Sequence, residues 1–408
     1  MHCRHCHTPL KDVFIDLVNQ PPSNSFLKQT QLDDPETYFP LKLYVCPECF
    51  LVQVDEYKNS QEIFSDDYVY FSSFSSSWVE HARQYVDMAA TRFNLDGESM
   101  VMEIASNDGY LLQWFVKKGI PCLGIEPTGG TADAAEKLGV PTMREFFGTD
   151  LARQIVAEGN QPDLLLGNNV LAHVPDINDF VQGLGIALKK GGTITMEFPH
   201  LMRLMDQNQF DTIYHEHFSY LSLTTVDRIF RESSLTIFDV EELPTHGGSL
   251  RIFARHADET DRPVLPSVFG LLRTEEEMGM KTVDYYTGFQ TRADAVKADL
   301  LEFLIRQKRD GKQVAAYGAA AKGNTMLNYC GIKNDLISFC VDASPHKQGL
   351  FLPGSHIPVL HPGALKERQP DYILILPWNI QKEIMQAHGY VSGWNGRFVT
   401  AIPRLTIH

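Results

Sequence analysis

The sequence has no long hydrophobic run and no excess of positive charge. Its 408 residues carry a formal net charge of −15, which argues against nonspecific nucleic-acid binding, because neutralising a phosphate backbone requires a basic surface. No apolar run approaches the roughly 20 residues that cross a bilayer, and the opening Met-His-Cys-Arg-His-Cys lacks the apolar core of a signal peptide. We therefore expect a cytoplasmic protein that binds neither membranes nor nucleic acid.

Cysteine is scarce and unevenly placed. Four of the seven cysteines form two C-x-x-C pairs, Cys3 with Cys6 and Cys46 with Cys49. In a cytoplasmic chain, two such pairs predict a structural zinc site with four thiolate ligands and no open position for water. One of the histidines at positions 2, 5 and 7 could replace a ligand. The other alternative, a redox disulfide pair, has no thioredoxin-like strand pattern around it.

The phosphate-binding signature G-x-G-x-x-G is also absent. In its place, an apolar run at 100–104 ends in Ala-Ser-Asn-Asp-Gly, and a helical pattern follows. This predicts a strand, a tight turn and a helix whose N-terminus can approach a ligand. Acids at Glu103 and Asp108 would repel a pyrophosphate and suit a cationic ligand with an adenosine tail, which favours S-adenosylmethionine over NAD. An ordinary strand, turn and helix of another α/β domain is the alternative.

The next strands extend this interpretation. The second strand ends in Glu126, at the spacing where a carboxylate meets ribose hydroxyls in dinucleotide-binding folds. Further strands and helices alternate, as a parallel doubly wound sheet requires. The strand after Asp163 leads into Asn168, Asn169 and His173, at the carboxyl end where such sheets bind ligands.

The segment Tyr-His-Glu-His-Phe-Ser-Tyr at 214–220 brings several proton-transfer groups together. General acid/base chemistry is one interpretation, with one imidazole as the base and Glu216 orienting it. A metal site formed by His215 and His217 is another, although no third ligand is obvious nearby. A structural cluster of satisfied side chains is the third.

The pattern of elements predicts an α/β protein of three parts: a zinc-binding module at 1–66, a Rossmann-like domain at 67–260 that suits S-adenosylmethionine, and a second Rossmann-like α/β domain at 261–408. The segment 68–78 joins the first two and is dense in aromatic and hydroxyl side chains, which suit either a sugar ring or a packed linker. The last domain opens with another strand, small-residue turn and helix. Its turn carries Lys322 instead of acids, which fits an anionic ligand.

Seven motifs taken together resemble the sugar C-methyltransferases of unusual-deoxysugar pathways. They are the paired C-x-x-C motifs, Y-x-Y-F-S-S, E-I-A-S-N-D-G, N-N-V-L-A-H-V-P-D, Y-H-E-H-F-S-Y, H-G-G-S-L-R and G-A-A-A-K-G-N. The resemblance covers essentially the whole chain in the same order. It implies an S-adenosylmethionine-dependent class I methyltransferase that methylates C3 of a nucleotide-linked 4-keto-deoxyhexose, with a structural zinc ion.

The resemblance also implies roles for individual residues. His217 is the expected base, with Tyr214, Glu216 and His173 around the reacting ring. The expected cofactor-binding residues are Glu103, Ser106, Asn107, Gly109, Tyr110, Glu126, Pro127, Phe147 and Asn168. The expected substrate-binding residues are Tyr70, Ser73, Asn169, His246, Arg251, Lys322, Asn324 and Lys347. An O- or N-methyltransferase and a noncatalytic zinc- and nucleotide-binding protein remain as alternatives, and the sequence leaves the nucleotide, the sugar and the oligomeric state open.

Overall fold

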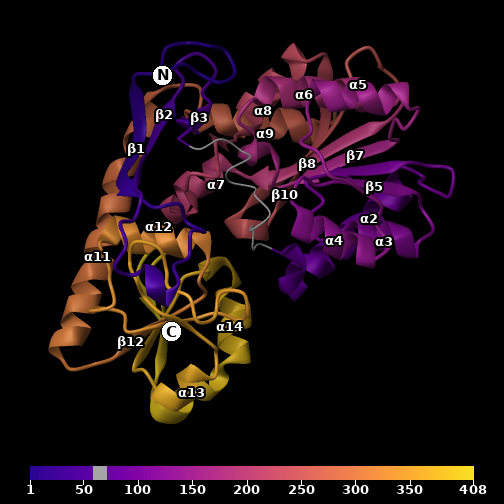
Figure 1. Ribbon diagram of the computed structural model, residues 1–408. Coiled ribbons are helices and arrows are strands. Elements are labelled where there is room, and N and C mark those ends of the chain that lie inside the picture. Colours follow the sequence, from indigo (N-terminus) through magenta and orange to yellow (C-terminus); the bar gives the residue numbers. More distant parts are fainter. Residues whose placement is uncertain (58–70) are drawn as a thin grey trace.

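The computed structural model describes residues 1–57 and 71–408. The chain is an α/β protein with three sheets, one for each expected part (Figure 1). The N-terminal module and the C-terminal domain lie on one side of the molecule, and the central domain lies on the other. Among the described residues, no helix combines the length and the apolar character needed to cross a bilayer.

The N-terminal module is a four-stranded antiparallel sheet that includes a strand from the central region of the sequence. Its own strands are β1 (Asp12–Gln20), β2 (Phe39–Val45) and β3 (Val52–Val54). The fourth strand, β9 (Ser219–Tyr220), pairs with β3, so that Val52 faces Tyr220. The predicted acid/base segment is therefore tied to the zinc-binding module by backbone hydrogen bonds.

The central domain contains a seven-stranded sheet in the order β10-β11-β8-β7-β4-β5-β6. The strands are β4 (Val101–Ile104), β5 (Cys122–Ile125), β6 (Thr142–Met143), β7 (Leu164–Asn168), β8 (Thr193–Pro199), β10 (Leu235–Leu243) and β11 (Ser249–His256). The first five are parallel, as expected, but β11 runs antiparallel to both of its neighbours. The reason is the short connection at 244–248, because a parallel crossover needs a dozen or more residues.

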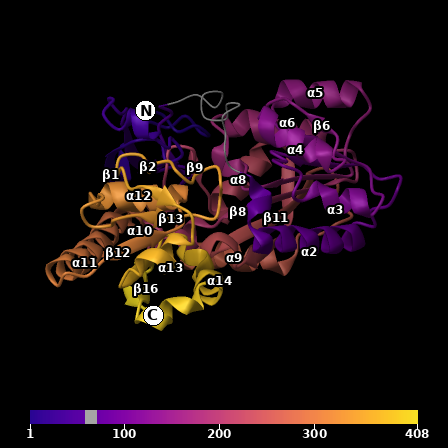
Figure 2. The same cartoon turned by 60° about the horizontal axis from the view of Figure 1, so that its bottom comes forward.

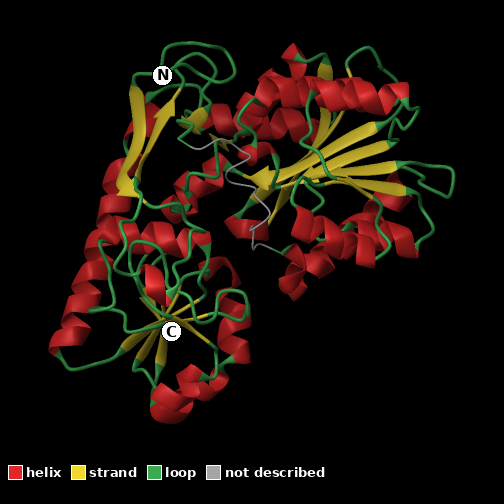
Figure 3. Cartoon of the chain, viewed as in Figure 1, coloured by secondary structure: helices red, strands yellow, loops and turns green. Residues whose placement is uncertain are grey.

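Helices cover both faces of this sheet (Figure 3). One face carries α2 (Ser76–Arg92), α3 (Leu112–Lys117) and α4 (Gly129–Lys137), and the other carries α5 (Thr149–Ala157), α6 (Ile177–Ala187) and α8 (Leu223–Glu232). Strand β4 shows the alternation that produces these two layers. Val101 packs with the first set of helices, whereas Met102 and Ile104 pack with the second.

The C-terminal domain contains a six-stranded sheet in the order β14-β13-β12-β15-β16-β17, parallel except for β17. Its strands are β12 (Val314–Tyr317), β13 (Cys340–Val341), β14 (Val359–Leu360), β15 (Tyr372–Ile375), β16 (Arg397–Thr400) and β17 (Thr406–Ile407). Its helices are α12 (Ala321–Cys330), α13 (Ala364–Arg368) and α14 (Gln381–Ala387). Strand β13 is short, with two residues that pair with β12 and β14.

Helix α7 (Leu201–Asp206) follows β8 in the central domain. The helices α9 (Pro266–Glu277), α10 (Asp284–Thr287) and α11 (Phe289–Arg309) connect the central and C-terminal domains. Gly279 and Gly288 lie at the breaks between these three helices. Strand β1 packs against α10, α11 and α12, and the two views in Figures 1 and 2 agree on this contact. The N-terminal module therefore packs on the C-terminal domain as well as on the central one.

Candidate active site

A cavity of about 510 Å³ lies where the three parts meet. This volume is in the range of ligand pockets in proteins. Fourteen of the predicted site residues line it: His173, Tyr214, Glu216, His217, Asn107, Tyr110, Glu126, Pro127, Phe147, Asn168, Asn169, His246, Lys322 and Lys347. All four expected catalytic residues are in this set, so the structure brings them together with residues expected to bind cofactor and substrate.

Two imidazoles face each other in the cavity wall, with ring centroids of His173 and His217 4.6 Å apart. Nδ1 of His217 lies 3.0 Å from the carbonyl oxygen of Thr212, and Nδ1 of His173 lies 2.8 Å from that of Glu216. Because a carbonyl oxygen only accepts hydrogen bonds, both Nδ1 atoms carry a hydrogen. Each Nε2 of a neutral ring then holds a lone pair that can accept a proton.

Burial keeps these rings neutral at ordinary pH. It lowers the pKa of His173 to about 4, although the Glu216 carbonyl opposes this. Burial and then the neighbouring His173 lower the pKa of His217 well below its usual range. Taking a charged imidazolium out of water is unfavourable, so both rings are proton acceptors rather than acids in the free enzyme.

Glu216 and Tyr214 complete this group. The carboxylate of Glu216 accepts hydrogen bonds from Nδ2 of Asn24 at 2.8 and 3.0 Å, and Asn24 belongs to the N-terminal module. The aromatic ring of Tyr214 packs on His217, with centroids 4.0 Å apart. The Thr212 carbonyl holds Nδ1 of His217, and the orienting role of Glu216 stays a prediction.

His215 points away from this group. Its Nε2 lies 3.2 Å from the carbonyl oxygen of Pro40, and its ring packs edge-on against Phe39 in β2. His215 and His217 therefore contact different neighbours and do not form a pair of ligands. Within the ranges that the structure describes, the only cluster suited to a metal ion is formed by cysteines.

The predicted cofactor end of the cavity is built around the turn after β4. Ala105, Asn107 and Gly109 all have positive φ, which folds the chain back before α3. A Cβ atom at Gly109 would lie 3.1 Å from the backbone of Ala135 in α4, so only glycine fits there without displacement. The carboxylate of Glu126 accepts hydrogen bonds from the backbone N–H groups of Asn107 and Thr128, which fixes it at the cavity wall.

Three of the predicted cofactor-binding residues, Glu103 in β4 and Ser106 and Gly109 in the turn, are buried and do not line the cavity. Burial, then the nearby Asp108 and Glu126, raise the pKa of Glu103 well above its usual range. The negative charge at this end therefore comes from Asp108 and Glu126. These residues position the turn that carries Asn107 and Tyr110.

Some of the predicted substrate-binding residues line the cavity, and others do not. Asn169 Nδ2 lies 3.0 Å from Nε2 of His246, and both residues line the cavity. Arg251 does not, because it is paired inside the central sheet with Glu197 at 2.7 Å and Glu241 at 3.2 Å. Asn324 donates to the carbonyl oxygen of Ser23 and joins the C-terminal domain to the N-terminal module.

The segment before α2 is held by the cofactor turn. The backbone N–H of Ser72 donates to Asn107, and that of Ser73 donates to Asp108. Ser72 lines the cavity, whereas Ser73 does not. Tyr70 lies outside the described residues. The sequence did not predict that Asn24 and Trp78 line the cavity. Only Trp78 could have been found, because it ends the aromatic segment 68–78.

Two lysines of the C-terminal domain also line the cavity. Lys322, in the first turn of α12, donates to Oδ1 of Asn379 at 2.8 Å. Lys347 donates to the carbonyl oxygen of Ala319 at 2.8 Å. Ala320 and Ala321 at the N-terminus of α12 also line the cavity. These residues suit an anionic group, in contrast to the acidic cofactor end.

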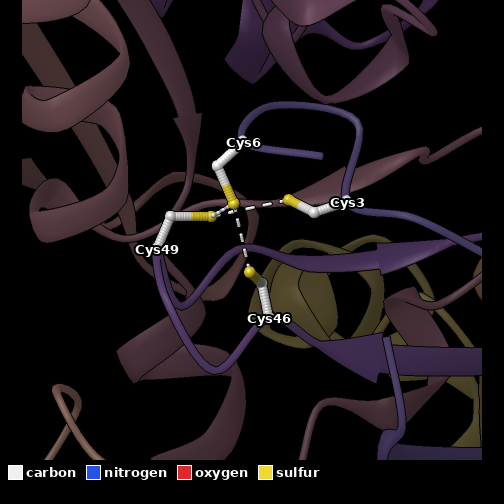
Figure 4. Close-up of side chains that lie close together, drawn as sticks. All are labelled: Cys3, Cys6, Cys46 and Cys49. Carbon is white, nitrogen blue, oxygen red and sulfur yellow. Dashed lines mark hydrogen bonds between the residues drawn. The ribbon is translucent and has the colours of Figure 1, made fainter. Parts of the chain in front are cut away.

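The four cysteines of the two C-x-x-C pairs converge on one point (Figure 4). Cys6 Sγ lies 3.4 Å from Cys46 Sγ and 3.6 Å from Cys49 Sγ, and Cys3 Sγ lies 3.5 Å from Cys49 Sγ. A tetrahedral zinc ion with bonds of about 2.3 Å would place its sulfur ligands roughly 3.8 Å apart, so the cluster fits zinc closely. His5 is bonded to Asn178 instead, and the predicted four-thiolate site is confirmed.

Family models match along the whole chain. A zinc binding domain matches residues 3–64, a methyltransferase domain matches 78–240, and a C-methyltransferase C-terminal domain matches 244–403. The fold, the cysteine cluster and these matches together define an S-adenosylmethionine-dependent methyltransferase with a zinc-binding module. C-methyltransferase NovU of Streptomyces niveus is 34% identical over 402 residues, which cover 98% of this chain and 95% of NovU. The chain therefore belongs to the C-methyltransferase family.

Solved structures of methyltransferases also match part of the chain. An S-adenosylmethionine-dependent methyltransferase from Clostridium acetobutylicum is 9% identical, with a TM-score of 0.34, over 44% of this chain and 92% of its own. The CcbJ methyltransferase from Streptomyces caelestis is 12% identical, with a TM-score of 0.35, over 43% of this chain and 89% of its own.

Proposed function

We propose that this C-methyltransferase methylates C3 of a nucleotide-linked 4-keto-deoxy sugar through an enolate. The observation that carries the proposal is the neutral His217 in the cavity wall, whose Nδ1 hydrogen is committed to the Thr212 carbonyl. Its Nε2 is then free to act as a base toward a substrate carbon. Membership of the C-methyltransferase family supports a carbon acceptor.

A carbon atom becomes nucleophilic only after it loses a proton, and an adjacent ketone makes this loss feasible. In the proposed reaction, His217 Nε2 takes the proton from C3, and the electron pair of the C–H bond moves into an enolate with charge on the 4-oxygen. A hydrogen-bond donor at that oxygen stabilises the charge as it develops. We assign this donor to the hydroxyl of Tyr214, whose ring packs on His217.

The two ends of the cavity suit the two proposed ligands. S-adenosylmethionine would supply the methyl group, and its positive sulfonium suits the end near Asp108 and Glu126, where Pro127 and Phe147 provide apolar contacts. The nucleotide diphosphate suits the opposite end, with Lys322, Lys347 and the N-terminus of α12. His173 and His217 line the same cavity, so proton removal and methyl transfer would take place on one substrate ring.

The test separates proton removal from methyl transfer. The zinc-loaded enzyme is incubated in D₂O with S-adenosylhomocysteine and a nucleoside-diphosphate 4-keto-deoxy sugar, and deuterium at C3 is followed by NMR. We expect exchange in the wild type and a loss of roughly 10²–10⁴-fold in His217→Gln, the usual contribution of a general base. Affinity for S-adenosylhomocysteine should not change.

His215→Gln is the matched control, because it alters a histidine of the same motif that faces β2 and not the cavity. It should retain exchange within a few-fold. Undiminished exchange in His217→Gln would refute the assignment of the base. Methyl transfer to an oxygen or nitrogen acceptor, without any exchange at carbon, would refute the proposal and favour the alternative of an O- or N-methyltransferase.

A further inference from the structure

A hydrogen-bonded group connects the central and C-terminal domains beside the cavity. It consists of Asp211 in the 3-10 helix η4 (Phe210–Thr212), Trp378 in η6 (Trp378–Ile380) and Lys322 in α12. The indole Nε1 of Trp378 donates to Oδ2 of Asp211 at 2.7 Å. The ammonium of Lys322 lies over the same indole ring, 4.9 Å from its centroid. Trp378 therefore contacts both a buried carboxylate and a cation.

The neighbours of this group show where the cation acts. Lys322 lines the cavity, whereas Asp211 does not and is 1% exposed. The charge of Lys322 contributes to the lowered pKa values of His217 and His246, so the ammonium acts on the reacting side of the cavity. Trp378 also packs against the loop that carries His246. The indole ring lies so close to Gly247 that a Cβ atom on that residue would be 2.4 Å from the ring.

Burial shifts the pKa of both Asp211 and Lys322, and the charge of each residue counteracts the shift in the other. Burial lowers the pKa of Lys322, and the negative charge of Asp211 raises it again. Burial raises the pKa of Asp211 to about 6, while Lys322 and the Trp378 N–H act in the opposite direction. The remaining polar contact of the ammonium is Asn379, which carries no charge. The buried thiol of Cys330 also faces Asp211.

The arrangement leaves the cation available to a ligand. Within residues 1–57 and 71–408, Lys322 forms no direct ion pair with a carboxylate: its ammonium donates to Asn379 and lies over the indole of Trp378, which in turn donates to Asp211. A direct pair would bind the ammonium to Asp211 and neutralise it locally. A carboxylate one ring away instead favours the charged form while the ammonium keeps free hydrogens.

We propose that Asp211 is a positioning residue that acts through Trp378 to hold Lys322 as a cation facing an oxyanion of the acceptor substrate. This inference rests on the proposed function for the identity of the acceptor. Two oxyanions have the required chemistry: the diphosphate of the nucleotide, and the 4-oxygen of the enolate. The experiment below distinguishes them.

The test uses Asp211→Asn in the full-length, zinc-loaded protein. An asparagine Oδ1 can still accept the Trp378 N–H, so the substitution removes the charge and keeps the hydrogen bond. Lys322 is titrated directly by NMR in protein labelled with ¹³C-lysine, with its signal assigned by Lys322→Arg. We expect its midpoint to move to lower pH in Asp211→Asn, because the neighbouring negative charge is gone. This readout needs no substrate, so it fails or succeeds independently of the proposed function.

Ligand and exchange measurements then identify the oxyanion. Thymidine diphosphate is titrated by calorimetry, and C3 exchange is measured, between pH 5.5 and 9. At the acid end, where Asp211 is protonated, wild type and Asp211→Asn should agree within about twofold; at pH 9 the variant should be at least tenfold weaker. Weaker binding of thymidine diphosphate would show that Lys322 faces the diphosphate. Slower exchange with unchanged binding would show that Lys322 faces the 4-oxygen of the enolate.

Asp335→Asn is the matched control, since it removes a carboxylate from an exposed pair with Lys308 elsewhere in the same domain. It should leave both measurements unchanged. An unshifted Lys322 midpoint in Asp211→Asn would overturn the proposal. A loss of binding or exchange that is the same at every pH would also overturn it, because that pattern indicates a weakened domain contact and not a missing charge.

Discussion

The contact between Asn24 and Glu216 makes the N-terminal module part of the active site, and its removal should be measurable. Asn24→Ala deletes the Nδ2 group that donates to both carboxylate oxygens at 2.8 and 3.0 Å. Both bonds come from one amide, so they count as one charge-assisted interaction of about 1.5–3 kcal/mol. If the full energy of this interaction supports the transition state, kcat/KM should fall roughly 10- to 150-fold, at 1.36 kcal/mol for each factor of ten.

A second substitution at the same position checks the electrostatic part of this argument. Asn24→Asp places a second carboxylate at hydrogen-bonding distance from Glu216, and like charges so close cannot both ionise easily. It should therefore cost more activity than Asn24→Ala, and the difference should shrink as the pH falls. The assay is the release of S-adenosylhomocysteine, with zinc content and thermal unfolding measured in parallel. Activity within twofold of wild type in Asn24→Ala would refute the reasoning, and so would a loss accompanied by loss of zinc.

Further predictions concern the zinc site, the cofactor turn and pH. Cys46→Ser, or chelation of zinc, should lower the unfolding temperature and abolish activity, because the module that holds Asn24 loses its metal; intact activity after verified zinc removal would contradict a structural ion. Gly109→Ala should cost about 2–4 kcal/mol of stability, from the positive φ together with overpacking, and should weaken S-adenosylhomocysteine binding, whereas Gly130→Ala, with open space around it, should do neither. His173, His217 and His246 have folded-state pKa values below their unfolded values. At these three positions the unfolded chain binds more protons, so the histidines should lower stability as the pH decreases from about 6.5 toward 4. The raised pKa values of Glu103 and Asp211 act in the opposite direction. Urea unfolding at several pH values is therefore compared between the wild type and His246→Gln, and an identical pH dependence in the two would contradict the prediction.

Local spacing predicted the parts of the site that depend on neighbouring residues. The two C-x-x-C pairs each place two sulfurs through one turn, and the acidic loop after β4 is a continuous segment, so both were readable from the sequence. The antiparallel β11 was readable in principle, since five residues cannot form a parallel crossover. Arg251 was misplaced because alternate residues of a strand face opposite sides, so a motif on a strand does not say which side chains reach the cavity.

Contacts between distant segments had no such signal. Asn24 lies 192 residues from Glu216, and Trp378 lies 167 residues from Asp211. Nothing in the composition around Asn24 or Trp378 marks either as a site residue, because each acquires its role from packing between domains. The same holds for the Thr212 carbonyl, since any residue carries one and only the fold brings it to His217.

These contacts explain why a zinc-binding module accompanies a methyltransferase domain. The segment that carries His217 leaves the central sheet after β8 and has little sheet structure of its own, apart from the two residues of β9. Strand β3 pairs with β9, and Asn24 donates to the carboxylate of Glu216, so two contacts from the module hold this segment. On the other side of the segment, the C-terminal domain contributes two hydrogen bonds. Nε1 of Trp378 donates to Asp211, and the hydroxyl of Thr325 donates to the carbonyl oxygen of Ile213. A base must be held to within a fraction of an ångström of the proton it removes, and a loop alone does not provide that precision. A zinc ion held by the four cysteines would therefore support the proposed base indirectly, by stabilising one of the two parts of the protein that hold its segment.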